Sequence, residues 1–148
     1  MNRIKTVVTA LVSVLSGWLG ILAIPMLILV LSNLIDYATG LVAIPKRGES
    51  VNSYKSFRGI AKKVCMWMLV GVGAMIDQLL LYACETIGIN LPFTFLVACI
   101  VAIWLICNEI ISILENMIDI GVKIPPFLLP LVKNIKRQVE DKAAVKEE

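Results

Sequence analysis

The polar residues best placed to do chemistry recur at helical spacing within the segment ICNEIISILENMIDIG, positions 106–121. At about 100° per residue they fall on roughly a third of a helix, and isoleucine, leucine and methionine occupy the remainder. The set is Asn108, Glu109, Ser112, Glu115, Asn116 and Asp119. Such an acidic face needs water, cations or hydrogen-bond donors around it. Two interpretations remain open: a hydrated helix end lying along a membrane surface, or a protein–protein surface or polar lining that meets basic residues.

Enzymatic, metal and redox chemistry find little support in the remaining residues. The chain has no histidine, so the commonest general base and metal ligand is absent. Its four cysteines form no CxxC pair, and no HExxH, GxSxG or P-loop pattern occurs. We therefore expect a protein that is not an enzyme, with no catalytic residue, no cofactor, no metal site and no nucleic-acid partner.

Two further carboxylates, Asp36 and Asp77, interrupt strongly apolar sequence. An ionisable side chain at the centre of a membrane helix costs about 2.5–3.5 kcal/mol and faces a bundle interior or a watery cavity. Small residues share the face of each carboxylate: Ser32, Thr39, Gly40 and Ala43 for Asp36, and Gly73 and Ala74 for Asp77. Small residues permit close helix approach, so either a hydrogen bond within one subunit or a contact between subunits fits the pattern.

The helices that must position these groups have the composition of a membrane protein. Hydrophobic residues make up 59% of the 148-residue chain and the mean hydropathy is +0.88, against about 45–50% apolar residues in soluble domains. The apolar residues gather in four blocks, at 7–22, 24–44, 64–84 and 91–107. A membrane helix needs about 20 such residues. The sequence thus predicts an all-α, polytopic integral membrane protein with three to four membrane helices, an amphipathic polar-striped last helix and a charged cytoplasmic tail.

The start of the chain allows two arrangements. Residues 7–44 are too long for one span and barely enough for two, and Pro25 permits a kink or break. Either a membrane-associated helix leads into one span, or both parts cross as a tight hairpin. A stripe of small residues in this region suits helix packing or, less well, a pore lining: Thr6, Thr9, Ser13, Ser16, Gly17 and Gly20.

Charge placement predicts the orientation. The segment 45–63 carries six basic residues against the single acid Glu49, and the segment 85–90 carries no Lys or Arg. By the positive-inside rule the first segment and the basic C-terminus are cytoplasmic, and the second segment is external. The predicted organisation is an N-terminal membrane-associated or spanning helix 1–23, a membrane helix 24–44, a basic cytoplasmic loop 45–63, a membrane helix 64–84, a short external loop 85–90, a membrane helix running into the acidic-striped helix 91–121, and a charged tail 122–148.

Several motifs occur in an order that resembles one known family. These are IDYATG at 35–40, Ser53, FRGIAKK at 57–63, Asp77, NEIISILEN at 108–116, Gly121 and the IP pair at 124–125. Together they resemble the phage-lysis and toxin-secretion holin family of Gram-positive bacteria and their phages. The resemblance covers about residues 35–126, and the ordered set, with NExxSxxEN closing a membrane helix, carries it.

The resemblance implies a small protein of three or so spans that accumulates in the bacterial cytoplasmic membrane and then oligomerises into lesions. Its partners would be further copies of itself, the lipid bilayer and an antiholin, with an endolysin or a large toxin as released cargo. An antiholin or another non-opening accessory membrane protein is the alternative, and a small transporter is a weaker one because the sequence has no internal repeat. The candidate residues for polar faces and subunit contacts are Asp36, Thr39, Gly40, Gly59, Lys62, Lys63, Asp77, Asn108, Glu109, Ser112, Glu115, Asn116 and Asp119.

Overall fold

Five α-helices account for most of residues 2–144, the part of the chain that the computed structural model describes. In chain order they are α1 (Asn2–Leu19), a single 3-10 turn η1 (Gly20–Leu22), α2 (Ala23–Lys46), α3 (Ser53–Thr86), α4 (Leu96–Ile120) and α5 (Leu128–Ala143). Three helical segments are long and apolar enough to cross a membrane: Gly20–Lys46, Ser53–Thr86 and Leu96–Ile120. The prediction of an all-α polytopic membrane fold is confirmed.

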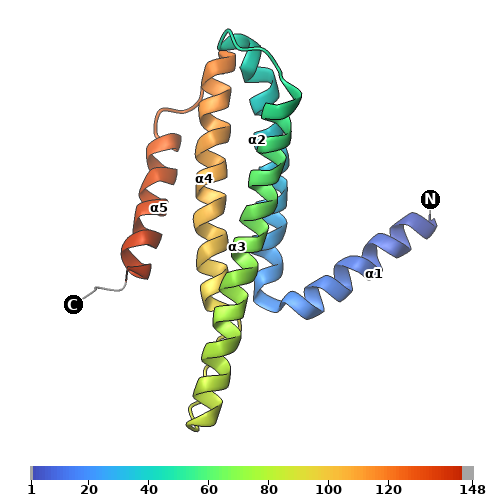
Figure 1. The fold of residues 1–148 in the computed structure, drawn as a ribbon, viewed down its shortest axis with the longest axis vertical. Coiled ribbons are helices and arrows are strands. Elements are labelled where there is room, and N and C mark those ends of the chain that lie inside the picture. Colours follow the sequence, from blue (N-terminus) through green and yellow to red (C-terminus); the bar gives the residue numbers. More distant parts are fainter. Residues whose placement is uncertain (1, 145–148) are drawn as a thin grey trace.

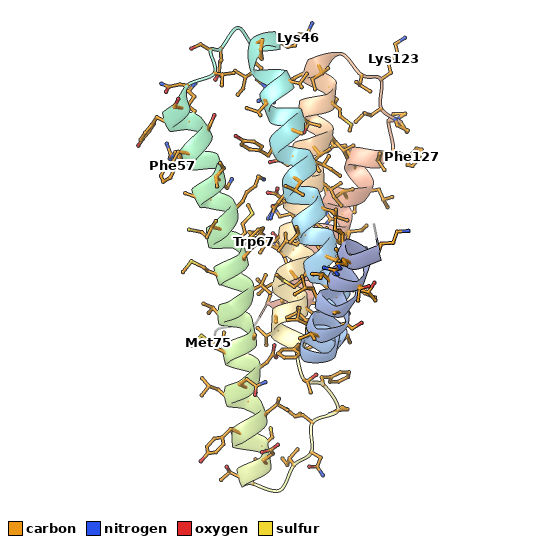
Figure 2. All side chains as sticks on the ribbon, turned by 90° about the vertical axis from the view of Figure 1, so that its right-hand side faces the viewer. Lys46, Phe57, Trp67, Met75, Lys123 and Phe127 are labelled. Atoms are coloured by element: carbon orange, nitrogen blue, oxygen red, sulfur yellow. The ribbon has the colours of Figure 1, made fainter. Side chains whose placement is uncertain are left out.

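Helix α4 is the centre of the bundle. Helices α2, α3 and α5 all pack on it, and consecutive elements from α2 to α5 alternate in direction (Figure 1). Helix α3 is the longest and extends beyond the ends of α2 and α4 at the end of the bundle opposite Lys46 (Figures 1 and 2). Because α2 and α3 contact α4 far more than each other, the sequence of α4 decides how the other helices are placed.

Small residues on α4 let its neighbours approach closely. Ala98 and Ala102, one helical turn apart, are fully buried, and Leu105 and Ile106 continue the same core. Small side chains at such spacing favour tight helix contacts in lipid, where packing rather than the hydrophobic effect drives association. Helices α2 and α3 contribute Leu29 and Val70 to this core.

Gly73 marks the closest approach of α3 to α4. A Cβ atom at this position would lie 2.9 Å from the Cα atom of Ala98 and 3.1 Å from its backbone nitrogen. Those atoms belong to the backbone and cannot rotate away, so only glycine fits without moving a helix. The small-residue face that the sequence places beside Asp77 is therefore an internal α3–α4 contact.

Helix α1 leaves the bundle at an angle, at the end opposite Lys46 (Figure 1). The break comes at η1, where Gly20 has a φ of 51°, a left-handed conformation that glycine adopts without a steric penalty. Pro25, which we expected to mark the break, lies in the first turn of α2, where a missing N–H costs little. Helix α1 is not among the three segments apolar enough to span, so whether residues 1–23 lie on the membrane or cross it stays a prediction.

Helix boundaries differ from the predicted organisation at two loops. Helix α3 begins at Ser53, so only residues 47–52 connect α2 and α3, and the FRGIAKK motif is helical rather than part of a loop 45–63. Asn52 begins the helix by accepting a hydrogen bond from the backbone N–H of Tyr54 at 3.0 Å, as N-cap residues do. The connection between α3 and α4 is longer than 85–90, since α4 begins only at Leu96.

The segment predicted as a tail, 122–148, contains a helix within its described part. Helix α5 packs along α4 (Figure 1), and Val132 is buried against Cys107 and Leu114. The charged residues of this segment are spaced so that Leu128, Leu129 and Val132 form one apolar edge. That edge explains why the segment docks instead of remaining solvated. Residues 145–148 lie outside the described part.

Two glycines of α3 that lie two residues apart offer a matched test of this packing. We expect Gly73→Ala to destabilise the protein by about 1–3 kcal/mol, because the new methyl group overpacks the α3–α4 contact. Gly71→Ala has nothing within 4 Å of the added atom and should leave the stability unchanged or raise it by up to about 1 kcal/mol through helix propensity. Thermal unfolding in detergent, followed by circular dichroism, measures both. Equal stabilities for the two variants would contradict the close approach.

Candidate functional site

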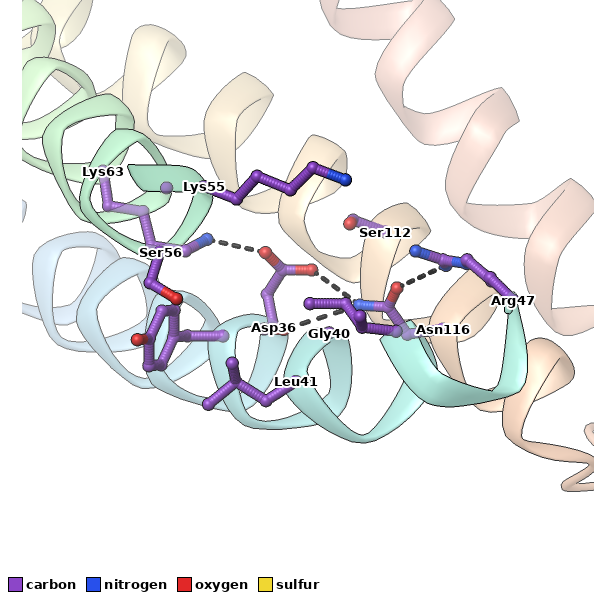
Figure 3. Close-up of a pocket in the computed structure, with 12 residues that line it drawn as sticks. Asp36, Gly40, Leu41, Arg47, Lys55, Ser56, Lys63, Ser112 and Asn116 are labelled. Atoms are coloured by element: carbon purple, nitrogen blue, oxygen red, sulfur yellow. Dashed lines mark hydrogen bonds and ion pairs between the residues drawn. The ribbon is translucent and has the colours of Figure 1, made fainter. Parts of the chain in front are cut away.

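Lys63 of α3 joins two carboxylates from two other helices inside the bundle. Its Nζ atom lies 2.7 Å from Oδ2 of Asp36 on α2 (Figure 3). It also donates to Oε2 of Glu109 on α4. The side chains of Lys63, Asp36 and Glu109 are only 14%, 16% and 4% exposed. A single ammonium group therefore connects all three candidate spanning helices away from bulk water.

These three residues lie at one depth. Each is about ten residues from the end of its helix, at Lys46, Ser53 or Ile120, which corresponds to about 15 Å at the α-helical rise. The triad thus forms a polar layer well inside the bundle, at the boundary between its polar end and its apolar remainder.

The charge balance of the triad makes its stability sensitive to the removal of any of its three side chains. Two carboxylates share one ammonium group, so the formal charge of Asp36, Glu109 and Lys63 together is −1. Burying ions is costly, and an ion pair repays the cost only when each group keeps its partners. Removing Lys63 would leave two carboxylates close together with no cation between them.

Asn116 of α4 extends the polar layer toward the Lys46 end of the bundle. Its Nδ2 atom donates to Oδ1 of Asp36 at 3.2 Å and to Oγ1 of Thr39 at 3.1 Å. Gly40 makes room for this amide, because a Cβ atom there would lie 3.6 Å from Nδ2. The predicted α2 face is therefore one side of a hydrogen-bond network with α4.

Arg47 closes the network at the end of α2. It donates to Oδ1 of Asn116 at 2.8 Å and forms an ion pair with Oδ2 of Asp119 at 2.5 Å. The two side chains of the ion pair are 38% and 39% exposed, so solvent screens it and its contribution to stability is small. Its structural effect is to align the last turns of α2 and α4.

A cavity of about 220 Å³ opens between these helices (Figure 3). Polar groups from three helices line it, including Ser56, Gly59, Lys63, Asp36 and Ser112. The volume is large enough for several water molecules, and the hydroxyl groups offer them hydrogen bonds. The polar end of the bundle thus holds a cavity in which polar and charged groups of three helices meet apolar side chains such as Leu41 and Ile44.

Lys55 lines this cavity and pairs with Glu49 in the loop between α2 and α3, at 2.8 Å between Nζ and Oε2. This hydrogen bond and the charge of Lys55 hold the pKa of Glu49 below its ordinary value. Both side chains are more than half exposed, so the pair orders the loop more than it stabilises the fold.

Asp77 has a different role, at the opposite end of α4. Its Oδ1 atom accepts from the backbone N–H of Val97 and its Oδ2 atom from that of Ala98, both at 2.9 Å. These are orphan donors of the first turn of α4, which begins at Leu96. A buried carboxylate of α3 thereby caps the N-terminus of α4 and complements its dipole.

Of the thirteen predicted residues, the structure brings six into one network and separates several others from it. The network contains Asp36, Thr39, Lys63, Glu109, Asn116 and Asp119. Lys62 and Asn108 line a different groove, on the other side of α4, together with Trp104. Glu115 is exposed. Asn108 and Glu115 therefore lie outside the network, because Asn108 lines a groove shared with α3 and Glu115 is exposed.

Three features were not predicted. Arg47 was counted among basic loop residues, although its place directly after the last turn of α2 suits a contact with a neighbouring helix end. Asn33 is 2% exposed, and its amide atoms have no hydrogen-bond partner within residues 2–144. Its position three residues before Asp36, on a similar face, was the available signal. Trp104 and Glu140 form the third feature, with 2.7 Å between Nε1 and Oε1; no local pattern connects residues 36 positions apart.

Comparison with known proteins assigns the chain to one family. The model of the bacteriophage holin family matches residues 13–137. An uncharacterized protein of Halalkalibacterium halodurans is 37% identical over 131 residues, which cover 88% of this chain and 89% of that protein. An uncharacterized 14.9 kDa protein of Clostridium perfringens, from the nagH 3' region, is 30% identical over 93% of this chain and 96% of its own length. An uncharacterized Listeria monocytogenes protein is 37% identical over 66% of this chain and 61% of its own. No solved structure matches.

Adjacent lysines on α3 give a matched test of the triad. We expect Lys63→Met to destabilise the protein by about 3–5 kcal/mol, because two buried carboxylates lose their shared cation. Lys62→Met removes an exposed neighbour and should change stability by less than about 0.5 kcal/mol. Unfolding in detergent micelles, monitored by circular dichroism, measures the difference. A Lys63→Met protein as stable as Lys62→Met would show that the triad contributes nothing to the fold.

A second pair tests the cap on α4. We expect Asp77→Leu to cost about 1.5–3 kcal/mol for each hydrogen bond lost to a charged acceptor, and to unwind the first turn of α4. Gln78→Leu alters an exposed neighbour and serves as the control. Hydrogen exchange at the amides of Val97 and Ala98 should accelerate in the first variant only. Unchanged protection of these two amides would rule out the cap.

Proposed function

The chain belongs to the bacteriophage holin family, and from this premise we propose that it is a holin. In this proposal copies accumulate in the bacterial cytoplasmic membrane, associate, and open lesions through which a cell-wall hydrolase or a large toxin leaves the cell. The protein catalyses no reaction and binds its cargo only in passing.

The observation that carries the proposal is the charged triad shared by three spanning helices. Lys63, Asp36 and Glu109 satisfy one another within one copy, so a single copy is tolerated in the membrane and can accumulate. The same groups are costly against lipid once the helices separate. Separation is therefore favoured only where water or other copies can take over as partners, which couples opening to association.

Asn33 adds a bias toward rearrangement. Its buried amide has no partner in the described chain, and an unsatisfied buried amide costs about 1–3 kcal/mol. The group gains a hydrogen bond only if α2 and its neighbours move or another copy supplies one. This supports a single copy that remains folded in the membrane before lesions open and whose helices can also repack.

Orientation in the membrane follows from the basic residues. Lys46 and Lys123 lie at the same end of the bundle (Figure 2), and Arg47, Lys55 and Arg58 belong to the same region. By the positive-inside rule this end faces the cytoplasm. The hollow polar cavity then opens toward the cytoplasm and the Asp77 cap lies near the external face.

An antiholin or another non-opening accessory protein is the second candidate. The observation that favours it is the completeness of the pairing in one copy, since Asp36, Asp77 and Glu109 all have internal partners. A protein that never opens a lesion would need only these internal partners for its carboxylates. The two candidates differ in what happens when copies accumulate.

Induced expression in a bacterial host separates these functions. We expect abrupt growth arrest, release of a cytoplasmic reporter enzyme, and rapid lysis when a cell-wall hydrolase without a signal peptide is co-expressed. Continued growth at a membrane level confirmed by immunoblot would remove the holin assignment and favour the accessory role.

The same assay tests the triad as the trigger. Asp36→Asn weakens the ion pair that holds α2 to α3, so lysis should begin earlier than in the parent at equal protein level. Lys62→Met, the exposed neighbour of Lys63, is the control and should keep the parental timing. If Asp36→Asn also lysed on the parental schedule, the triad would not control opening.

A further inference from the structure

Helix α5 lies beside the part of α4 that crosses the membrane, not beyond it. Trp104, which contacts α5, is eight residues after the first residue of α4, or about 12 Å along the helix. Lys142 and Ala143 of α5 line a groove together with Ile100 and Ile103 of α4. The end of α5 thus reaches nearly the start of the candidate span Leu96–Ile120.

A specific contact holds α5 at this depth. Nε1 of Trp104 donates to Oε1 of Glu140 at 2.7 Å, and the Nζ atom of Lys136 lies 5.2 Å from the centre of the indole ring. Lys136 and Glu140 are also 3.8 Å apart between Nζ and Oε1. The indole ring is therefore bound by a cation over its face and a carboxylate at its N–H.

The opposite face of α5 is polar. The residues exposed there are Lys133, Asn134, Arg137 and Asp141, with Gln138 at the edge of this face, where it also lines the groove with α4. Lys142 and the exposed side chains of Leu131 and Ile135 lie on a flank of the helix instead. The exposed faces of α2 and α3 at comparable depth are apolar instead, and include Leu27, Leu31, Met68 and Met75. The side of the bundle formed by α5 is thus polar, whereas the sides formed by α2 and α3 are apolar and suit contact with lipid.

Lipid cannot cover this face of α5, because charged side chains within the hydrocarbon region require water or a counter-charge. We propose that in the assembled protein the outer face of α5 lines the aqueous passage, with α5 held on α4 by the Trp104 contact. This inference rests on the proposed pore-forming function. It assigns the water-facing side to α5 and leaves α2 and α3 to face lipid or other copies.

The charges of this face indicate which solutes the passage favours. Lys133 and Arg137 outnumber Asp141, so each copy contributes a net charge of +1 to the wall. Basic rings attract anions. The passage should conduct small anions in preference to cations.

A thiol-modification experiment tests the assignment on the full chain in planar lipid bilayers. The four native cysteines are replaced by alanine, and single cysteines are introduced as Gln138→Cys on α5 or Leu27→Cys on α2, whose side chain is 60% exposed. A membrane-impermeant, positively charged methanethiosulfonate is added while current flows. We expect Gln138→Cys to lose at least about half of its current, reversibly with a reductant, because the adduct narrows a wetted wall. Leu27→Cys should keep its current.

Other results would overturn the inference. A mass shift at Gln138→Cys with no loss of current would place α5 on the membrane surface, outside the conducting path. An unmodified Gln138→Cys during conduction would place this face in a dry contact. If the parent protein conducts and either of these results is found, only the role of α5 is rejected. If the parent gives no current in bilayers and no growth arrest in cells, the pore-forming function itself is rejected.

The ion preference gives an independent readout. With a potassium chloride gradient, the reversal potential of the parent should lie toward that of chloride. The double variant Lys133→Glu and Arg137→Glu changes the charge of this face from +1 to −3 and should move the reversal potential toward that of potassium. An identical reversal potential in both proteins would count against a wall formed by α5.

Discussion

The ammonium group of Lys63 is the constraint on which the rest of the bundle depends. Helices α2 and α3 pack on α4 rather than on each other, yet Lys63 reaches across to Asp36 as well as to Glu109. None of the three helices can shift along its axis without removing a charge from its partner in a place that water reaches poorly. The triad therefore fixes the register of three helices whose apolar surfaces alone would allow many registers.

The triad also separates two parts of the molecule, an end that holds a cavity and an end that is closely packed. Toward Lys46 the helices enclose a polar cavity and join through Asn116 and Arg47. Toward the other end, Gly73 lies against the backbone of Ala98 and leaves no room for a Cβ atom. A bundle built this way holds a cavity at one end and a close helix contact at the other, so separating its helices requires mainly that the close contact be broken.

Much of this organisation was predictable from the sequence, because its signals are local. Blocks of apolar residues predict the spanning helices, and acidic and amide residues within them predict where internal pairing is needed. The importance of Asp36, Glu109 and Asn116 follows from their types and positions alone. The choice of Lys63 over its neighbour Lys62 does not, because it depends on the rotation of α3 about its axis.

The unpredicted features arise from contacts between distant segments. Whether Asp77 would bind a second copy or its own chain could not be decided locally, since the first of the amides that donate to it lies twenty residues later. The docking of α5 depends on Trp104 and Glu140, which no periodicity links. Charge alternation in 131–148 resembles a solvated tail, and only the partner surface on α4 shows that its apolar edge has a place to bind.

The carboxylate of Asp77 has a consequence for biogenesis. A ribosome delivers α3 before α4, so the acceptor for the first amides of α4 already exists when residues 96–98 emerge. That acceptor stabilises the first turn of the newer helix as soon as the turn forms. The order of synthesis, together with the thickness of the bilayer, thus favours the depth at which the second arm of this helical hairpin begins.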